Sequence, residues 1–367
     1  MDFLSKLEGH LREAALALLA EGAISALPKT IQVEPSREDG RGDFTSAIAL
    51  GSNNETGLER RLFAEALAAK LRGTLDFAEI DVAGPGFLNL AVAPRAWGAM
   101  LATLLAEGKN YGRGQWGEGR EVDIGFLPVD ETVPLQSGDA RGAVMGDALA
   151  NMLDFTGFRA SRSYRLNGEG DFTVRLGQLV RLVQSGKPSK ANLSLADLTA
   201  EIGEDATRLG ILMEQSSVPV TLDAALLTDL SQVNPLFHVQ YAHARCCAIR
   251  QKGELALPGL AEPTSWDPNA FADEGARLIL RLLALYPRKI DHVVRRGEPH
   301  WLARYLHDLA SVMHAQYYRS LTAPHLRFIR VDDRLLTGAR LALVRGVEAV
   351  LKSGLALLGV CAPDEIR

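Results

Sequence analysis

The sequence has few cysteines, no long apolar run and no strong excess of charge of one sign. Its three cysteines, two of them adjacent, do not make a disulfide framework, so we expect a reducing, cytoplasmic compartment. No stretch approaches the roughly 18 uninterrupted apolar residues of a membrane span, so no membrane association is expected. Residues 1–19 predict an amphipathic helix of mixed charge and not a signal peptide. The net charge of −5 argues against general coating of nucleic acid but is compatible with a local basic face.

What is present is a composition typical of globular proteins. The chain has 367 residues, of which 47% are hydrophobic and 23% charged, enough for two or three domains. The first 107 residues predict a separate α/β domain. We expect helices at about 2–20, 59–71 and 94–106, an extended piece at 31–34 and a strand pair at 78–92 around Gly84-Pro85-Gly86. The glycines of this region permit positive-φ turns.

A Gly-rich stretch from Gly108 to Gly119 predicts a linker, and a strand–turn–helix unit follows it. Residues 121–127 predict a buried strand, residues 139–155 a helix that Gly157 ends, and residues 159–166 a second strand. Such a unit presents backbone N–H groups to a phosphate, although many α/β proteins contain one.

The segment from Pro134 to Asn151, PLQSGDARGAVMGDALAN, resembles the signature segment of bacterial class I arginyl-tRNA synthetases. In that family a Pro-Leu pair leads into His-x-Gly-His and then into Ala-Arg-Gly-Ala-x-x-Gly-Asp-Ala-Leu-Ala. Pro134, Leu135, Gly138 and the run from Ala140 to Ala150 match this frame. Gln136 and Asp139 stand where the family has its two histidines.

The resemblance implies what these replacements cost. In the family, the two histidines and the lysines of a Lys-Met-Ser-Lys loop stabilise charge on the ATP phosphates as the aminoacyl-adenylate forms. Lys187-Pro188-Ser189-Lys190 resembles a remnant of that loop, although a solvated basic loop explains it more simply. Loss of one preorganised donor costs about 3 kcal/mol. A carboxylate about 4 Å from a phosphate adds at most roughly 4 kcal/mol of repulsion at an effective dielectric of about 20, unless Mg²⁺ or Arg141 cancels it.

We therefore expect no catalytic residues and no cofactor, neither ATP nor Mg²⁺. The predicted degenerate nucleotide site consists of Gln136, Gly138, Asp139, Lys187 and Lys190.

The centre of the chain is short. After the turn at 167–170, the apolar spacing fits a helix over 171–184, since the run exceeds a usual strand, and a β-hairpin over 159–184 is the alternative. A complete doubly wound domain needs more strands and helices than residues 121–190 supply. Compared with the family, the second half of the Rossmann fold is absent.

From about residue 197 the chain predicts mostly helices, one of them from about Ala270 to Leu285 and ended by Pro287. The segments 234–245, 302–310, 340–345 and 354–360 resemble the family's anticodon-binding domain. Gly42-Asp43-Phe44 and the segment 84–89 resemble its N-terminal domain, which contacts the outer corner of tRNA.

The expected fold is thus multidomain, α/β plus all-α. Its predicted parts are an N-terminal tRNA-corner-binding-like α/β domain (1–107), a reduced, truncated Rossmann-like catalytic domain (120–196) and a helical anticodon-binding-like bundle (197–367).

Basic residues gather in three places, a partly aromatic stretch around 241–250 and two further basic clusters around 288–296 and 319–334. Arginine and aromatic side chains together suit phosphate contact and base stacking, whereas most charge runs are solvated faces. With the resemblance, tRNA is the expected partner. The predicted tRNA-binding residues are Tyr241, Arg245, Arg288, Lys289, Arg319 and Arg327.

Two smaller groups of residues are interpreted as structural. His243, Cys246 and Cys247 have the spacing with which a helix aims three side chains at one metal ion, but no fourth ligand is evident, so no metal is expected. His300, His307 and His314 repeat every seven residues, which places them on one side of a helix as a packed face.

Three functions fit the sequence. The first is a catalytically inactive relative of arginyl-tRNA synthetase that binds tRNA. The second is an enzyme that reuses the remnant pocket, with Asp130, Glu131, Asp139 and Asp147 as metal-binding carboxylates. The third is a protein-interaction module, in which the open edges of a reduced sheet pair with a protein partner or with a second copy.

Overall fold

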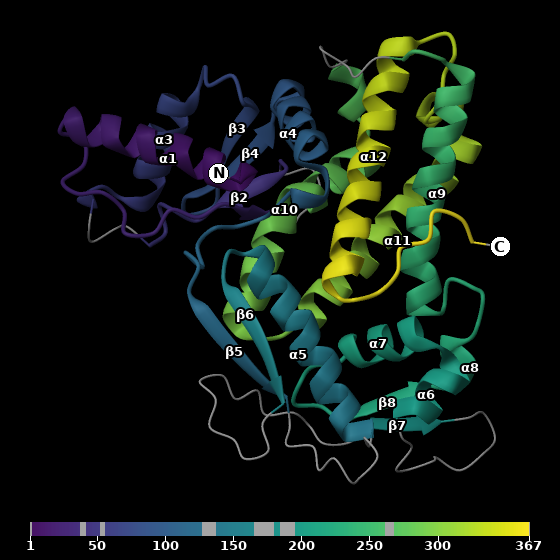
Figure 1. Cartoon of the computed structure of the whole chain (residues 1–367). Coiled ribbons are helices and arrows are strands. Elements are labelled where there is room, and N and C mark those ends of the chain that lie inside the picture. The colour runs from purple at the N-terminus through teal and green to yellow at the C-terminus, as the bar shows by residue number, and fades with distance from the viewer. Residues whose placement is uncertain are drawn as a thin grey trace. The chain divides into compact units, whose positions relative to one another are not determined.

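The computed structural model describes residues 2–36, 42–51, 56–126, 137–164, 180–183, 195–260 and 268–366 (Figure 1). Asp130, Glu131, Gln136, Lys187 and Lys190 lie outside these ranges. The chain folds into two compact units. The first combines residues 1–106, 259–285 and 329–343, and the second combines residues 107–258, 286–328 and 344–367. The three domain ranges expected from the sequence stay a prediction.

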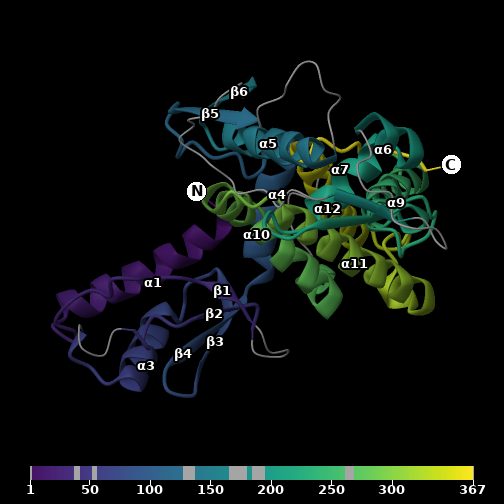
Figure 2. The same ribbon diagram turned by 90° about the horizontal axis from the view of Figure 1, so that it is seen from below.

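The N-terminal part of the first unit is an antiparallel sheet with helices beside it. The strands are β1 (Glu34–Pro35), β2 (Phe44–Ser46), β3 (Phe77–Ala83) and β4 (Phe87–Val92), in the order β1-β2-β4-β3. The helices are α1 (Phe3–Ala20), α3 (Arg60–Leu71) and α4 (Pro94–Glu107). Figure 2 shows α1 and α3 beside this sheet. The helices and the strand pair predicted for residues 2–106 are confirmed within one or two residues.

Local sequence explains these elements. The side chain of Asp2 accepts a hydrogen bond from the backbone N–H of Ser5 and so begins α1, and Glu59 begins α3 in the same way. The core forms where Phe3, Phe44 and Trp97 meet. The ring centroids of Phe3 and Trp97 lie 5.2 Å apart, and those of Phe44 and Trp97 lie 5.8 Å apart. This aromatic cluster joins α1, the sheet and α4 around one core.

The second unit contains a β–α–β element. Strands β5 (Glu121–Phe126) and β6 (Arg159–Tyr164) pair in parallel, and α5 (Ser137–Phe155) connects and covers them (Figure 1). The predicted strand–helix–strand order is confirmed. Within the described residues this sheet has two strands, which fits the expected reduction of a doubly wound core.

The glycine-rich stretch before β5 is anchored to the second unit. The indole N–H of Trp116 donates to the carboxylate of Asp291 at 2.8 Å, and the ring of Trp116 meets that of Phe158 edge to face at 4.8 Å. The backbone N–H of Gly117 donates to the carbonyl of Thr156, and a Cβ at Gly117 would lie 2.4 Å from the nitrogen of Phe158. Glycine permits this close approach, so the predicted linker is a packed connection.

The helix predicted over 171–184 is wrong at its C-terminal end. Residues Val180–Val183 form β7, which pairs in parallel with β8 (Val220–Asp223). The hairpin alternative also fails there, because β6 pairs with β5. A short apolar run has no decisive periodicity, and its strand partner lies some forty residues further along the chain. Residues 165–179, the rest of this prediction, lie outside the described residues.

The remainder of the chain is mainly helical, as predicted. Besides short 3-10 turns at Gly108–Asn110, Pro268–Phe271 and Pro324–Leu326, its helices are α6 (Leu195–Ile202), α7 (Glu204–Leu212), α8 (Ala224–Leu227), α9 (Pro235–Ala256), α10 (Glu274–Arg296), α11 (His300–Thr322) and α12 (Arg334–Leu357). Helix α9 begins with Asn234 as its cap and Pro235 in its first turn. Helices α7, α9 and α11 pack against one another in the second unit.

The expectation that Pro287 ends a helix is wrong, because Pro287 lies inside α10. Proline removes one backbone donor, but the neighbouring turns are held by packing. Tyr286 and Ile290 are fully buried, and the hydroxyl of Tyr286 lies 2.9 Å from that of Ser353. Burial on both sides of the proline outweighs its local preference to stop a helix.

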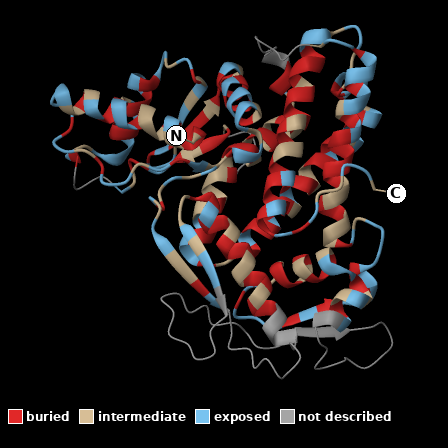
Figure 3. Ribbon diagram, in the orientation of Figure 1, coloured by how far each residue is buried: buried red, intermediate tan, exposed pale blue. Residues whose placement is uncertain are grey.

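Buried residues follow the inward faces of the helices in both units (Figure 3). Among the described helices, none combines the length and the hydrophobicity that crossing a membrane requires.

Candidate functional site

The predicted anion-binding turn lies at the start of α5. The helix begins at Ser137, so Gly138 and Asp139 belong to its first turn and not to the preceding loop. Backbone N–H groups of a first helical turn lack partners within the helix and suit an anion. Gln136, Lys187 and Lys190, the other predicted members of this site, lie outside the described residues.

Asp147, further along α5, is held by two arginines. Its carboxylate accepts a hydrogen bond from Nε of Arg162 on β6 at 3.0 Å and another from Arg208 on α7. Arg162 also donates to the side-chain oxygen of Asn151 at 2.6 Å. This network fixes β6 and α7 to α5. Because two cations already neutralise the Asp147 carboxylate, it is poorly placed to bind a metal ion as the second hypothesis requires.

Arg141, which the sequence placed near the degenerate site, is fully buried. Its guanidinium donates to the carbonyl of Gln215 at 2.5 Å. Burial lowers the pKa of Arg141, and the charges of Glu214 and Glu298 act in the opposite direction. The side chain therefore ties α5 to the loop that follows α7.

Glu298 extends this polar network. Its carboxylate accepts from the hydroxyl and the backbone N–H of Ser216, at 2.5 and 3.2 Å, and lies 3.0 Å from Nδ1 of His300. Burial lowers the pKa of His300, although Glu298 opposes the shift. These contacts are internal to the second unit and assign His300 a structural role.

A second candidate site lies between α9 and α11. The guanidinium of Arg245 lies over three tyrosine rings, 4.5 Å from the centroid of Tyr241, 4.1 Å from that of Tyr317 and 5.1 Å from that of Tyr318. Arg245 is only 8% exposed, whereas Tyr318 is 47% exposed. Because the buried Arg245 contacts all three rings, it holds the aromatic group together, while Tyr318 stays exposed to solvent.

Three histidines pack beside this aromatic group. The ring of His238 stacks on that of His307 at 4.5 Å and meets that of His314 at 4.7 Å. Nε2 of His314 donates to the carbonyl of His238 at 3.0 Å, so its Nδ1 accepts from Arg245 at 2.6 Å. Burial, aided by neighbouring positive charge, lowers the pKa of His238 and of His314 to about 4. Of the predicted heptad, His307 and His314 share one packed face, while His300 belongs to the Glu298 network.

The structure brings two of the predicted tRNA-binding residues into contact. Tyr241 and Arg245 touch. Arg319 follows Tyr318 on α11 and is exposed, as is Arg327 in the segment after it. Arg288 and Lys289 are partly exposed on α10. The prediction missed Tyr317 and Tyr318, although their position directly before Arg319 was a signal in the sequence.

Comparisons with known proteins agree with this architecture. Residues 5–92 match the family described as the Arginyl tRNA synthetase N terminal domain, and residues 239–366 match the DALR anticodon binding domain. The Arginine--tRNA ligase of Xanthobacter autotrophicus is 27% identical over 578 residues, covering 98% of each chain. The chain belongs to the arginyl-tRNA synthetase family. The Arginine--tRNA ligase of Rhizobium etli is 25% identical, covering 92% of this chain and 94% of that protein.

Solved arginyl-tRNA synthetases share the fold. The enzyme of Thermus thermophilus superposes with a TM-score of 0.68 at 14% identity, covering 99% of this chain and 100% of that chain. The enzyme of Plasmodium falciparum gives 0.67 at 10% identity, with 99% of each chain covered. By its two domain matches and its curated relatives, this chain is an arginyl-tRNA synthetase-like protein with an anticodon-binding domain. The span of 578 residues aligned with the Xanthobacter relative exceeds this chain's 367 residues by 211, so at least that many aligned positions have no residue here.

Proposed function

We propose that this member of the arginyl-tRNA synthetase family binds tRNA through its two outer segments and does not charge it with arginine. The observation that carries the proposal is the match of both outer segments, 5–92 and 239–366, in a chain 211 residues shorter than its aligned span with a relative. The chain keeps the two segments expected to contact tRNA, and we assign the shortfall to the catalytic region between them.

The described part of that region supports the assignment. Strands β5 and β6 are the first two of the many that a doubly wound sheet requires. The side chains of Arg141 and Asp147 form internal bonds that hold α5 to α7 and to the loop after it. Gln136 and Asp139 replace two charge-stabilising histidines, each worth about 3 kcal/mol in a transition state. A slow enzyme survives such replacements, but loss of half a domain removes the substrate pocket itself.

The proposed tRNA surface is the exposed end of the aromatic group. Tyr318 presents a half-exposed ring, and Gln232 holds its hydroxyl at 3.0 Å. Arg319 and Arg327 are exposed on the same stretch of chain. A ring for base stacking beside cations for phosphate contact is the combination that single-stranded RNA loops need. Because the net charge is −5, binding must rest on such local clusters.

The test pairs two measurements on the full chain. Binding of total tRNA is followed by fluorescence anisotropy over a salt series, and charging is followed with labelled arginine, ATP and tRNA. We expect binding that weakens steeply with salt, enrichment of one tRNA species, and no charging. Robust charging would overturn the loss of activity, whereas no binding at low salt would overturn tRNA recognition.

A double variant separates point changes from the missing region. Gln136→His combined with Asp139→His restores the family's signature, and we expect it to leave the chain unable to charge tRNA. Recovery of charging would place the defect in the two side chains alone. Calorimetry with ATP and Mg²⁺ tests the competing hypothesis of a nucleotide enzyme. A measurable heat of binding would support that hypothesis, and no heat would count against it.

A further inference from the structure

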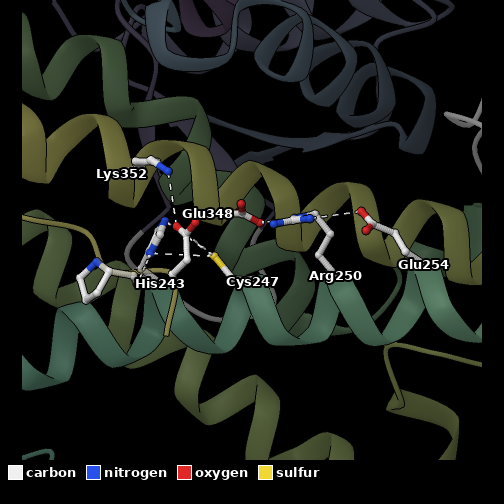
Figure 4. Close-up of polar contacts among 8 residues, drawn as sticks. His243, Cys247, Arg250, Glu254, Glu348 and Lys352 are labelled. Carbon is white, nitrogen blue, oxygen red and sulfur yellow. Dashed lines mark hydrogen bonds and ion pairs between the residues drawn. The ribbon is translucent and has the colours of Figure 1, made fainter. Parts of the chain in front are cut away.

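Three side chains of the second unit meet where the C-terminal tail, residues 358–366, crosses α9, and Figure 4 labels the two that come from α9, His243 and Cys247. His243 and Cys247 lie one turn apart on α9, and both are fully buried. Asp364 comes from the tail and is 61% exposed at its side chain. One possible ligand atom from each residue lies within 4.8 Å of the other two. The tail thus supplies the further ligand that the sequence around α9 did not reveal.

His243 is oriented as metal-binding histidines are. Its Nδ1 lies 2.9 Å from the carbonyl oxygen of Pro363. A carbonyl oxygen only accepts, so Nδ1 carries the hydrogen and Nε2 keeps a free lone pair. A histidine that ligates a metal commonly donates its other N–H to a backbone carbonyl in this way, which fixes the ring and its tautomer.

The separations approach those of a tetrahedral site. Sγ of Cys247 lies 4.0 Å from Nε2 of His243 and 3.9 Å from Oδ1 of Asp364. Ligands bound at about 2.0–2.3 Å from one Zn²⁺ ion stand roughly 3.3–3.8 Å apart. Sγ is also 4.0 Å from Nδ1 of His243, and the ligand atoms of His243 and Asp364 lie within 4.8 Å of each other, so metal binding requires these side chains to turn and move inward by about 1 Å or more.

The charges around the thiol favour a cation. Sγ of Cys247 lies 3.9 Å from the carboxylate of Asp364, and the carboxylate of Glu348 is also nearby (Figure 4). The guanidinium of Arg250 donates to the carboxylate of Glu348 at 2.9 Å. Lys352 lies 3.4 Å from Asp364. A divalent ion bound between these groups stabilises the thiolate directly.

We propose that His243, Cys247 and Asp364 bind one Zn²⁺ ion that fastens the C-terminal tail to α9. The set of one nitrogen, one sulfur and one oxygen ligand suits zinc, and a water molecule completes four-coordination. Binding releases the thiol proton to solvent and involves no oxidation or reduction. The site lies outside the tRNA surface and the degenerate nucleotide site, and its existence does not depend on either.

Cobalt titration of the full chain tests the proposal, since Co²⁺ replaces Zn²⁺ in such sites and reports on its ligands. We expect one equivalent of Co²⁺ to give a thiolate-to-cobalt absorption band in the near ultraviolet, displaced by one equivalent of Zn²⁺. Cys247→Ser removes the band and Asp364→Asn weakens binding at least tenfold. The matched controls are Cys246→Ser, at the adjacent buried cysteine, and Cys361→Ser, at the exposed cysteine of the same tail.

Stability gives a second readout. Zn²⁺ at about 100 times its Kd favours the folded state of the wild-type chain about 100-fold, and we expect a smaller effect for Asp364→Asn. If Cys247→Ser fails to fold, the exposed Asp364→Asn variant decides alone. A band that persists unchanged in Asp364→Asn, one that disappears in Cys361→Ser, or no saturable binding to the wild type would each overturn the proposal.

Discussion

Asp43 and Arg277 form an ion pair although 234 residues separate them in the chain. One carboxylate oxygen of Asp43 lies 2.9 Å from the guanidinium, and the other accepts from the backbone N–H of Val92 at 2.8 Å. Asp43 is 1% exposed, so its charge relies on these partners. The pair joins the N-terminal sheet to residues of the anticodon-binding segment within the first unit.

Removing this cation leaves a buried carboxylate without its charged partner. We expect Arg277→Ala to lower the free energy of unfolding by about 2 kcal/mol, measured by urea denaturation. The expected loss of stability is smaller than for a fully buried ion pair because Arg277 is itself partly exposed. Lys70→Ala is the control, since its partner Glu21 is exposed, and we expect it to change stability by less than about 0.5 kcal/mol. Equal effects of the two variants would contradict a special role for Arg277.

Gly42 and Gly73 offer a matched pair for the cost of a side chain at positive φ. Both have positive φ, but a Cβ at Gly42 would lie 2.9 Å from the backbone of Leu90, whereas a Cβ at Gly73 meets nothing within 4 Å. We expect Gly73→Ala to cost about 1 kcal/mol, for backbone strain alone, and Gly42→Ala to cost clearly more. Thermal denaturation of both variants gives the comparison. An equal loss of stability would mean that the backbone of β4 shifts to accept the added Cβ without further cost.

Arg245 should be required for stability. We expect Arg245→Ala to lower the free energy of unfolding by about 3 kcal/mol, because it empties the space among three tyrosine rings and leaves Nδ1 of His314 without its donor. Arg245→Lys restores the charge but not the planar fork, so it should recover only part of the loss. The exposed Arg319→Lys should be nearly neutral. If Arg245→Ala leaves the free energy of unfolding unchanged, the three tyrosine rings pack stably without the arginine.

The buried histidines predict a loss of stability on acidification. The pKa values of His238 and His314 fall to about 4 in the folded chain, from an ordinary value of 6.5. The unfolded chain therefore binds more protons between these values, and stability rises with pH there. The contribution of the two neutral histidines to the free energy of unfolding is complete above about pH 6.5. Toward pH 4 it declines, by at most about 1.4 kcal/mol per pH unit for each histidine.

Urea denaturation at several pH values between 4 and 7 measures this slope. We expect His238→Gln to reduce the slope, since one of the two titrating groups is gone, and the exposed His325→Gln to leave it unchanged. A wild-type slope of zero across this range would contradict the neutral, buried state of the two rings.

The proposed tRNA surface predicts distinct effects for cations and rings. Arg319→Ala and Arg327→Ala should each reduce the slope of log affinity against log salt by about 1, because each removes a phosphate contact. Tyr318→Ala should cost about 1–3 kcal/mol of binding with little change in salt slope, as expected for lost stacking. Arg159→Ala, at an exposed position outside both matched segments, is the control. A uniform effect of all four variants would point to non-specific charge attraction.

Local patterns predicted much of this fold. The helices and strands of residues 2–106 follow from hydrophobic periodicity, from capping by Asp2 and Glu59, and from the turn at Gly84-Pro85-Gly86. The β5–α5–β6 order followed from a strand, a turn and a helical stripe. In these cases the residues that decide the structure are neighbours in the chain.

The predictions were wrong where residues distant in the chain determine the local structure. β7 is a strand because Val220–Asp223 pairs with it, and α10 continues through Pro287 because Tyr286 and Ile290 are buried against other elements. Likewise, no spacing in the sequence links His243 to Asp364, 121 residues away, and the partners of Asp147 come from β6 and α7. Helical spacing identified which residues share a helix face, but not what that face meets.

The first unit is assembled from three separate stretches of the chain, the last of which ends at Leu343. A ribosome adds about 5–20 residues per second, so roughly 10 to 50 s pass between the emergence of the N-terminal sheet and that of its last contributing helix. During that time Asp43 has no Arg277, and the surface that the later stretches cover is exposed. The sheet therefore stays incomplete while the 251 residues from 93 to 343 are added. Nascent chains stalled before residue 277 should be the species that chaperones bind and proteases cut.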